Sequence, residues 1–344
     1  MTHAESRMVF FSAVRLAMLS VLFVVPAHAY ETKVFELPLD TAVATASPAP
    51  DGKVWFVGRK PGALGILDPS TGEVRFIPLG KNSAPRSVMA DKDGNAWIAD
   101  SGQNAMVRVN VNTDEVKVWP VPQDLGYANL NTFVFDHDRM LWFTGTGPNG
   151  PSDGEKGVYG RLDVATGDIK VWRPPQGRGA SGMTVTPDGE VWYVSVAPSY
   201  IAHIDRATGN SHVVKTPHPN AEPHGVWSDS KGNLWVDEWN TGYLDRYTPK
   251  TGKWKSWLVP GDKPPHLVGV FVDDKDIVWV VQRTANATYA FDSATEKFIA
   301  AIPGSKPEAG VRQILGRPGE VWLPEGGTGR IMLVKTGAVK AAVR

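Results

Sequence analysis

Short runs of alternating hydrophobic and polar residues, separated by polar turns, repeat along the chain. In residues 87–119 this pattern predicts strands at Ser87–Ala90, Asn95–Ala99, Met106–Asn110 and Glu115–Trp119. Asp93-Gly94 is typical of a tight hairpin turn, because glycine adopts a positive φ without steric cost. Beyond the N-terminal segment, no window spaces its apolar residues as an amphipathic helix does. We therefore expect an all-β protein.

One tryptophan marks the second strand of each repeat. Neighbouring members of the series are 42 to 50 residues apart, and a propeller blade of four strands needs roughly 40–50 residues. The series consists of Trp55, Trp97, Trp142, Trp192, Trp235, Trp279 and Trp322. Seven repeats predict a seven-bladed β-propeller that forms a single domain over residues 30–344, although a length of 344 residues alone would suggest two domains.

The last repeat lacks its outermost strand, because the chain nearly ends after residues 331–337. A matching phrase, Val34-Phe35-Glu36-Leu37-Pro38, stands near the other end of the sequence. We expect this N-terminal strand to complete the last blade, since a closed ring leaves no open sheet edge. The sealed ring and the formal net charge of zero favour a monomer.

The N-terminal residues indicate export. Arg7 and Arg15 precede the apolar run of residues 16–25, and Ala27-His28-Ala29 has the small residues that a signal peptidase reads. We predict a signal peptide at residues 1–29 with cleavage before Tyr30, and a periplasmic or secreted protein. The apolar run is too short to span a bilayer, so no membrane insertion is expected after processing.

Composition narrows the possible partners. Lys plus Arg and Asp plus Glu both number 36, and no segment gathers the basic residues that a nucleic-acid binder needs. The absence of cysteine excludes disulfides, thiolate nucleophiles and zinc–thiolate sites. A small-molecule or cyclic peptide-like ligand fits this composition better than nucleic acid does.

Two positions in each repeat should face the mouth of the central channel. The entry position lies eleven residues before the tryptophan, and the exit position lies three residues after it. The entry residues are Ala44, Arg86, Asn131, Ser181, His224 and Val268, with Arg312 near the equivalent place in the last blade. The exit residues are Gly58, Asp100, Gly145, Ser195, Glu238, Gln282 and Glu325.

The fifth repeat combines groups that no other repeat does. Glu222-Pro223-His224-Gly225 enters it and Asp237-Glu238-Trp239 leaves it. Carboxylates suit a hard divalent cation, and histidine moves protons near neutral pH. The residues therefore allow a metal-assisted acid/base site. They also allow a simpler interpretation, in which Glu222 and Glu238 are solvated loop residues and His224 is a packing residue.

At these residues the sequence resembles the streptogramin B lyase (virginiamycin B lyase) family of seven-bladed propellers. The resemblance rests on Glu222-Pro223-His224-Gly225 with Glu238 in the next strand. It implies a magnesium-dependent elimination that opens a cyclic depsipeptide at its ester without adding water. Glu222 and Glu238 would hold Mg²⁺, and His224 would be the general base. The family carries a further histidine where this chain has Ser181.

Other residues are candidates for substrate binding. Trp239 could present a hydrophobic wall to a ligand, and His266, two residues before the sixth entry position, could reach the same mouth. Ser181 and Asn131 occupy entry positions of neighbouring blades. Arg86 and Arg312 could bind an anionic ligand, although pairing with acids such as Asp100 or Glu325 is the interpretation that we favour.

Three functions remain open at this point. The first is an exported lyase-like propeller with the roles given above. The second is a gluconolactonase-like hydrolase of lactones or esters, in which a channel metal such as Ca²⁺ activates water and the ligands, Asn131 among them, come from several blades. The third is a periplasmic binding propeller without catalysis, because the fold hosts many functions.

Overall fold

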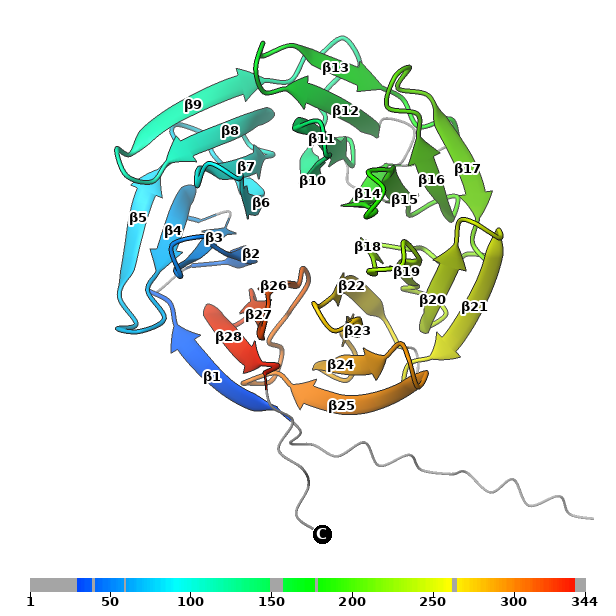
Figure 1. The fold of residues 1–344 in the computed structure, drawn as a ribbon. Coiled ribbons are helices and arrows are strands. Elements are labelled where there is room, and N and C mark those ends of the chain that lie inside the picture. Colours follow the sequence, from blue (N-terminus) through cyan, green and yellow to red (C-terminus); the bar gives the residue numbers. More distant parts are fainter. Residues whose placement is uncertain are drawn as a thin grey trace, which may run out of the picture.

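Seven four-stranded antiparallel sheets stand around a central axis in the computed structural model (Figure 1). The structure describes residues 30–38, 41–58, 60–148, 157–176, 179–261 and 265–337. Within these ranges all regular elements are strands, and no helix is present that could cross a membrane. The expected fold, a seven-bladed β-propeller, is confirmed. The predicted signal peptide, residues 1–29, lies outside the described residues.

The strands run outward from the axis in each blade. The first three blades contain β2 (Val43–Pro48), β3 (Val54–Gly58), β4 (Ala63–Leu67) and β5 (Val74–Pro78); β6 (Pro85–Ala90), β7 (Ala96–Asp100), β8 (Ala105–Asn110) and β9 (Glu115–Pro120); and β10 (Leu130–Phe135), β11 (Met140–Gly145), β12 (Val158–Asp163) and β13 (Ile169–Trp172). The next three contain β14 (Ala180–Val185), β15 (Val191–Ser195), β16 (Tyr200–Ile204) and β17 (Ser211–Lys215); β18 (Val226–Ser228), β19 (Leu234–Asp237), β20 (Tyr243–Thr248) and β21 (Lys253–Leu258); and β22 (Leu267–Val272), β23 (Ile277–Gln282), β24 (Ala287–Asp292) and β25 (Lys297–Pro303).

The N-terminal strand closes the ring, as predicted. The seventh blade has the order β1-β28-β27-β26, in which β1 (Glu31–Glu36) is the outer strand beside β28 (Arg330–Lys335), β27 (Glu320–Glu325) and β26 (Leu315–Arg317). Six residue pairs join β1 to β28, from Glu31 with Lys335 to Glu36 with Arg330. Phe35 is buried against Trp322, with ring centroids 5.9 Å apart.

In four blades the repeated tryptophan donates its indole N–H to an aspartate six residues earlier, in the turn between the first two strands. In the second blade, Asp91 accepts hydrogen bonds from the backbone of Asn95 and from the indole Nε1 of Trp97, the latter at 2.8 Å. Asp136, Asp229 and Asp273 accept the indole N–H of their tryptophans in the same way. A buried indole usually has such a polar partner, which explains why the turn aspartate and the tryptophan recur together in these four blades. The indole nitrogen of Trp55 is buried without a partner.

The inner strands carry irregularities at their channel ends. The pairing of β2, β6, β10, β14 and β22 with the next strand shifts register beside the entry position, for instance between Pro85 and Ser87 and between Ala180 and Met183. A bulge leaves the extra residue out of the ladder and redirects it. Arg86, Asn131 and Ser181 occupy these positions, and all three line the channel cavity.

Candidate functional site

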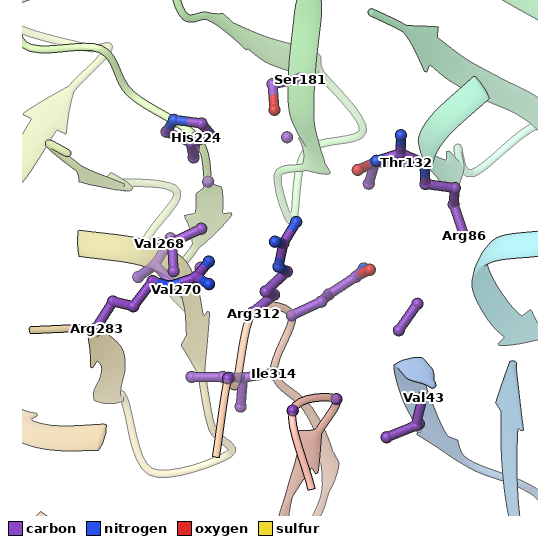
Figure 2. Close-up of a pocket in the computed structure, with 18 of the residues that line it drawn as sticks. Val43, Arg86, Thr132, Ser181, His224, Val268, Val270, Arg283, Arg312 and Ile314 are labelled. Atoms are coloured by element: carbon purple, nitrogen blue, oxygen red, sulfur yellow. The ribbon is translucent and has the colours of Figure 1, made fainter. Parts of the chain in front are cut away.

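A cavity of about 1340 Å³ occupies one end of the central channel. Ligand pockets commonly measure about 300–1,000 Å³, so this one has room for a cyclic peptide-like molecule. Five residues predicted from the sequence to bind or transform a ligand line it, namely Arg86, Asn131, Ser181, His224 and Arg312. Figure 2 shows His224, Ser181, Arg86 and Arg312 around one open space, with the Arg312 side chain extending towards its middle.

A buried aspartate holds the backbone beside His224. Asp237, at the end of β19, accepts hydrogen bonds from the backbone N–H of His224 at 2.7 Å and of Gly225 at 2.9 Å. It also accepts the N–H of Gly269 in the next blade. Burial raises the pKa of Asp237 to about 7, and these backbone donors oppose the rise. Nothing in the sequence pattern around Asp237 indicated that its carboxylate would accept hydrogen bonds from the entry segments of two neighbouring blades.

His224 is a neutral imidazole at physiological pH. Burial, and after it the positive charge of Arg312, lower the pKa of His224 to about 4. A neutral imidazole has a free lone pair that can accept a proton. The side chain therefore has the protonation state that a general base needs, at a position that faces the cavity.

Aromatic rings form a wall beside His224. The ring of Trp239 lies 5.3 Å from that of His224, centroid to centroid, and stacks on the ring of His266 at 4.4 Å with an interplanar angle of 3°. Neither Trp239 nor His266 is among the residues that line the cavity itself. The structure thus brings these two predicted binding residues together with His224 at its edge.

Polar side chains from two further blades face the cavity away from this wall. The amide nitrogen of Asn131 lies 3.4 Å from the hydroxyl of Ser181. Thr144 donates a 2.6 Å hydrogen bond to the carbonyl of Ser181, which fixes the backbone there. Because serine and asparagine side chains both donate and accept hydrogen bonds, this pair can orient a carbonyl group of a ligand.

The cavity lining is positively charged. Besides Arg86 and Arg312, it includes Arg283 and Lys306, with Glu308 as its one acidic residue among the described parts of the chain. Sequence analysis missed Arg283 and Lys306, because both lie outside the two positions that the repeat defines. Arg283 directly follows β23, and Lys306 lies in the loop after the outer strand β25. A positive lining favours ligands that carry or develop negative charge.

Glu222 and Glu238 lie outside the cavity lining. Glu222 has a positive φ of 52°, its backbone N–H donates to Ser199 at 2.8 Å, and its carbonyl accepts the N–H of Trp239 at 3.3 Å. Glu238 is fully buried, so the interpretation of Glu238 as a solvated loop residue is wrong. The assignment of this pair as metal ligands stays a prediction.

The carboxylate of Glu238 lies within the fifth blade. Thr241 donates a hydrogen bond to its Oε2, and Nδ1 of His218 lies 2.9 Å from the same oxygen. Ligand atoms of His218, Glu238 and Asp245 all lie within 4.8 Å of one another. Burial raises the pKa of Glu238 and of Asp245, and the Glu238 carboxyl raises that of Asp245 further.

The donors around Glu238 do not match the set that magnesium prefers. Mg²⁺ is usually bound through one or two carboxylates with several waters in octahedral geometry. Here the converging donors include an imidazole, and Glu222 is not among them. This cluster is a different set from the predicted pair Glu222 and Glu238. Magnesium at that pair, or calcium as the alternative, stays a prediction from the sequence.

Together, the fold and the channel define a seven-bladed propeller with a ligand-sized, positively charged cavity and a neutral histidine. The chain belongs to the virginiamycin B lyase family, whose model matches residues 2–289. Comparison with curated protein sequences gives no significant match.

Solved structures of this family share the fold. A streptogramin B lyase matches with a TM-score of 0.79 and 19% identity, over 90% of this chain and 99% of that one. Virginiamycin B lyase from Staphylococcus aureus matches with a TM-score of 0.78 and 18% identity, over 89% and 99%. A catalytically inactive histidine-to-alanine variant of the Staphylococcus aureus enzyme with quinupristin matches with a TM-score of 0.78 and 19% identity, again over 89% and 99%. At these identities the likeness establishes the fold alone.

Proposed function

We propose that this protein is an exported, lyase-like propeller that opens an ester or lactone of a cyclic peptide-like molecule by elimination. The observation that carries the proposal is the neutral imidazole of His224 at the cavity, between the ring of Trp239 and the charge of Arg312. Membership of the virginiamycin B lyase family supports the reaction class. The inactive histidine variant of the Staphylococcus aureus enzyme supports the assignment of a histidine to the chemistry.

The reaction needs one base and a place for a departing carboxylate. His224 takes the proton from the carbon next to the ester-bearing carbon, and the electron pair of that C–H bond forms a C=C bond. The bond between the ester-bearing carbon and its oxygen breaks, and the oxygen leaves as part of a carboxylate. The product is a linear molecule of unchanged mass, because no water is added.

The cationic lining suits the charge that develops in this step. Arg312 lies close enough to His224 to lower its pKa, so a guanidinium stands beside the position where the proton is removed. A guanidinium stabilises both an enolate-like charge and a carboxylate through charge-assisted hydrogen bonds. Trp239 would support the apolar part of the ligand, and Asn131 with Ser181 would orient a carbonyl.

Ser181 replaces the further histidine of the family pattern, and serine is not a base at neutral pH. A second base is not required for this elimination, because the proton taken by His224 can pass to solvent after the product leaves. We therefore assign proton transfer to His224 alone. The hydroxyl of Ser181 serves in ligand orientation.

The test is turnover of a type B streptogramin such as quinupristin by the purified mature chain. We expect the wild-type chain to form a ring-opened product. His224→Ala should lower the rate of its formation by a factor of about 10²–10⁴, the usual contribution of a general base. The matched control is His212→Ala, because His212 is exposed on the outer strand β17. Parallel reactions with added magnesium and with a chelator test the predicted metal dependence.

Calorimetry with the same ligand separates this proposal from a binding-only function. Ligand binding without turnover in the wild-type chain would favour a periplasmic binding propeller and contradict the lyase. The hydrolase hypothesis expects metal ligands from several blades. The one group of converging metal-type ligands in the described residues comes from the loop before β18, the residue after β19, and β20. No observation therefore favours the hydrolase over the lyase.

A further inference from the structure

The fifth blade contains three buried or half-buried side chains that converge on one point away from the channel cavity. His218 lies in the loop that connects β17 to β18, Glu238 directly follows β19, and Asp245 is in the middle of β20. Their ligand atoms lie within 4.8 Å of one another. None of the three lines the channel cavity.

The carboxylates lack the partners that buried charges require. Glu238 and Asp245 are both 0% exposed. Oε1 of Glu238 and both carboxylate oxygens of Asp245 are buried and make no hydrogen bond of acceptable geometry. The polar groups nearest to Asp245 are the Glu238 carboxyl itself and the hydroxyl of Ser256, and neither is a cation. Among the described residues, no lysine or arginine forms an ion pair with either acid, and the imidazole of His218 is the basic group in contact with Glu238. Buried carboxylates are normally paired, hydrogen-bonded or coordinated to a metal.

The imidazole contributes a fourth unpartnered atom. Nδ1 of His218 lies 2.9 Å from Oε2 of Glu238, yet it makes no hydrogen bond of acceptable geometry. Two ligand atoms at about this separation are compatible with binding the same cation, since metal–nitrogen and metal–oxygen distances are roughly 2.0–2.2 Å. The ring of His218 stacks on Tyr243 with centroids 4.2 Å apart, which holds its orientation.

We propose that His218, Glu238 and Asp245 form a binding site for one first-row divalent cation, with Zn²⁺ or Mn²⁺ as the class of ion. One imidazole with two carboxylates suits these ions better than the all-oxygen sites of Mg²⁺ and Ca²⁺. The cation neutralises the two acids and satisfies the orphan oxygens. The side chain of His218 is 28% exposed, so a cation can reach the site from solvent at this residue.

The site would fix the loop that leads to the channel. His218 precedes His224 by six residues, and between them the backbone N–H of Asn240 donates to the carbonyl of Ala221 at 3.1 Å. A cation that joins His218 to β20 therefore anchors the start of the segment that ends at the proposed base. This inference stands on the metal ligands alone, so it holds whether or not the channel catalyses elimination.

The test is direct metal binding by the full mature chain after removal of metals with a chelator. Calorimetric titration with Zn²⁺ and with Mn²⁺ should show one ion per chain, and the thermal midpoint should rise with added ion, because a ligand that binds only the folded state stabilises it. Asp245→Asn and His218→Gln should each weaken binding about ten-fold or more. Co²⁺ added to the wild-type chain should give visible absorption bands that His218→Gln alters.

The matched control is His203→Gln. His203 also contacts a carboxylate, that of Glu190, but on the fourth blade and without a third converging ligand, so its loss should leave the affinity unchanged. Absence of one-to-one binding in the wild-type chain would overturn the proposal, as would wild-type affinity in both ligand variants. If the wild-type chain binds no ion, the metal-free Asp245→Asn chain should be more stable than the metal-free wild-type chain, because the two acids would then share a proton instead of a cation.

Discussion

His224 owes its neutral state to its surroundings, and this gives the proposed base a measurable signature. The groups near it include the guanidinium of Arg312, the ring of Trp239, and Asp237, which accepts its backbone N–H. Burial and the charge of Arg312 place its pKa at about 4. The imidazole therefore stays able to accept a proton well below the pH at which an ordinary histidine becomes protonated.

The first prediction concerns pH. Below the range in which Asp237 titrates, with its pKa of about 7, we expect kcat/KM to fall on further acidification with a midpoint near the His224 pKa of about 4. Arg312→Gln should move this midpoint to higher pH, because a positive charge that opposes protonation is removed. Measurement of the imidazole pKa by NMR on the ligand-free chain checks the same shift without turnover. An imidazole midpoint near 6.5 in this NMR titration of the wild-type chain would contradict the burial of His224.

The same shift affects folding, with a defined sign. The folded-state pKa of His224 lies below the unfolded value of about 6.5, so the unfolded chain binds more protons between these two values. Its contribution to stability is therefore present above about pH 6.5 and is lost as the pH falls towards 4. Urea unfolding of the wild-type chain and of His224→Ala across this window should show a smaller acid loss in the variant.

Asp237 provides a second test at the scale of one residue. Asp237→Asn turns one carboxylate oxygen into an N–H donor, which would face a backbone N–H of His224, Gly225 or Gly269. We expect a loss of about 1–3 kcal/mol in the free energy of unfolding, the cost of a buried unsatisfied group. Turnover should fall as well, because the backbone of His224 loses its anchor.

Denaturant unfolding measures this loss, with Asp51→Asn as the control. Asp51 is an exposed turn residue that accepts one backbone N–H, so its change should stay within about 0.5 kcal/mol. An Asp237→Asn variant with wild-type stability and turnover would show that Asp237 does not position the entry loop.

At the scale of whole elements, the blades could be predicted from the sequence because the turn residues and the alternating strands that define a blade lie close together within each repeat. The turn aspartate binds both its own loop and the indole six residues later, as Asp91 does with Trp97. The strands expected in the second repeat match β6 to β9 to within two residues at each end. Ring closure could be predicted too, because a missing outer strand and a spare matching segment are both visible in the chain.

The site could be predicted only in part, because sequence position does not give the direction of a side chain within a blade. The entry residues Arg86, Asn131, Ser181 and His224 line the cavity, since bulges or strand ends release them from the ladder. Glu238 shares the exit position with Asp100 and Glu325, and these two acids accept hydrogen bonds from Ser83 and Ser305 in neighbouring loops. The exit position is therefore a place that holds loops together, and its side chain need not face the channel.

One further signal in the sequence could have revealed the cluster around Glu238. The third strand of each blade has one residue opposite the position that follows the repeated tryptophan. In the seven blades these residues are Gly65, Val107, Gly160, Ala202, Asp245, Tyr289 and Met332. Asp245 is the one charged residue in the series. A lone acid at an otherwise apolar or small position indicates a specific partner.

The element that closes the ring gives a prediction about stability. Phe35 is 6% exposed and packs on Trp322, so Phe35→Ala should cost about 3–5 kcal/mol. Val34→Ala in the same strand is the control, because Val34 is 39% exposed and its loss should change stability by less than about 0.5 kcal/mol. Equal thermal midpoints for the two variants would mean that β1 contributes little to closure of the seventh blade.

At the scale of the whole molecule, seven separate sheets stand side by side in a ring, and the first and last strands of the chain belong to one sheet (Figure 1). Since no inner edge is open to another chain, we predict a monomer. Light scattering coupled to size-exclusion chromatography checks this, and a stable dimer would show that an outer surface pairs two copies.

The cavity is the feature of the whole molecule on which the proposed function depends. It combines one neutral base with an excess of positive charge, and the ring of Trp239 lies at its edge beside His224. These features suit a reaction that removes a proton and releases a carboxylate, and they do not require an activated water molecule. Elimination and hydrolysis therefore differ in one observable, which is the origin of the oxygen atoms in the product.

The most direct measurement is the mass of the product formed from a type B streptogramin in water enriched in oxygen-18. The account predicts a linear product with the mass of the starting molecule and no oxygen-18, formed by the wild-type chain and by His212→Ala but not by His224→Ala. A product that gains one water and carries oxygen-18 would contradict elimination and assign the channel to hydrolysis.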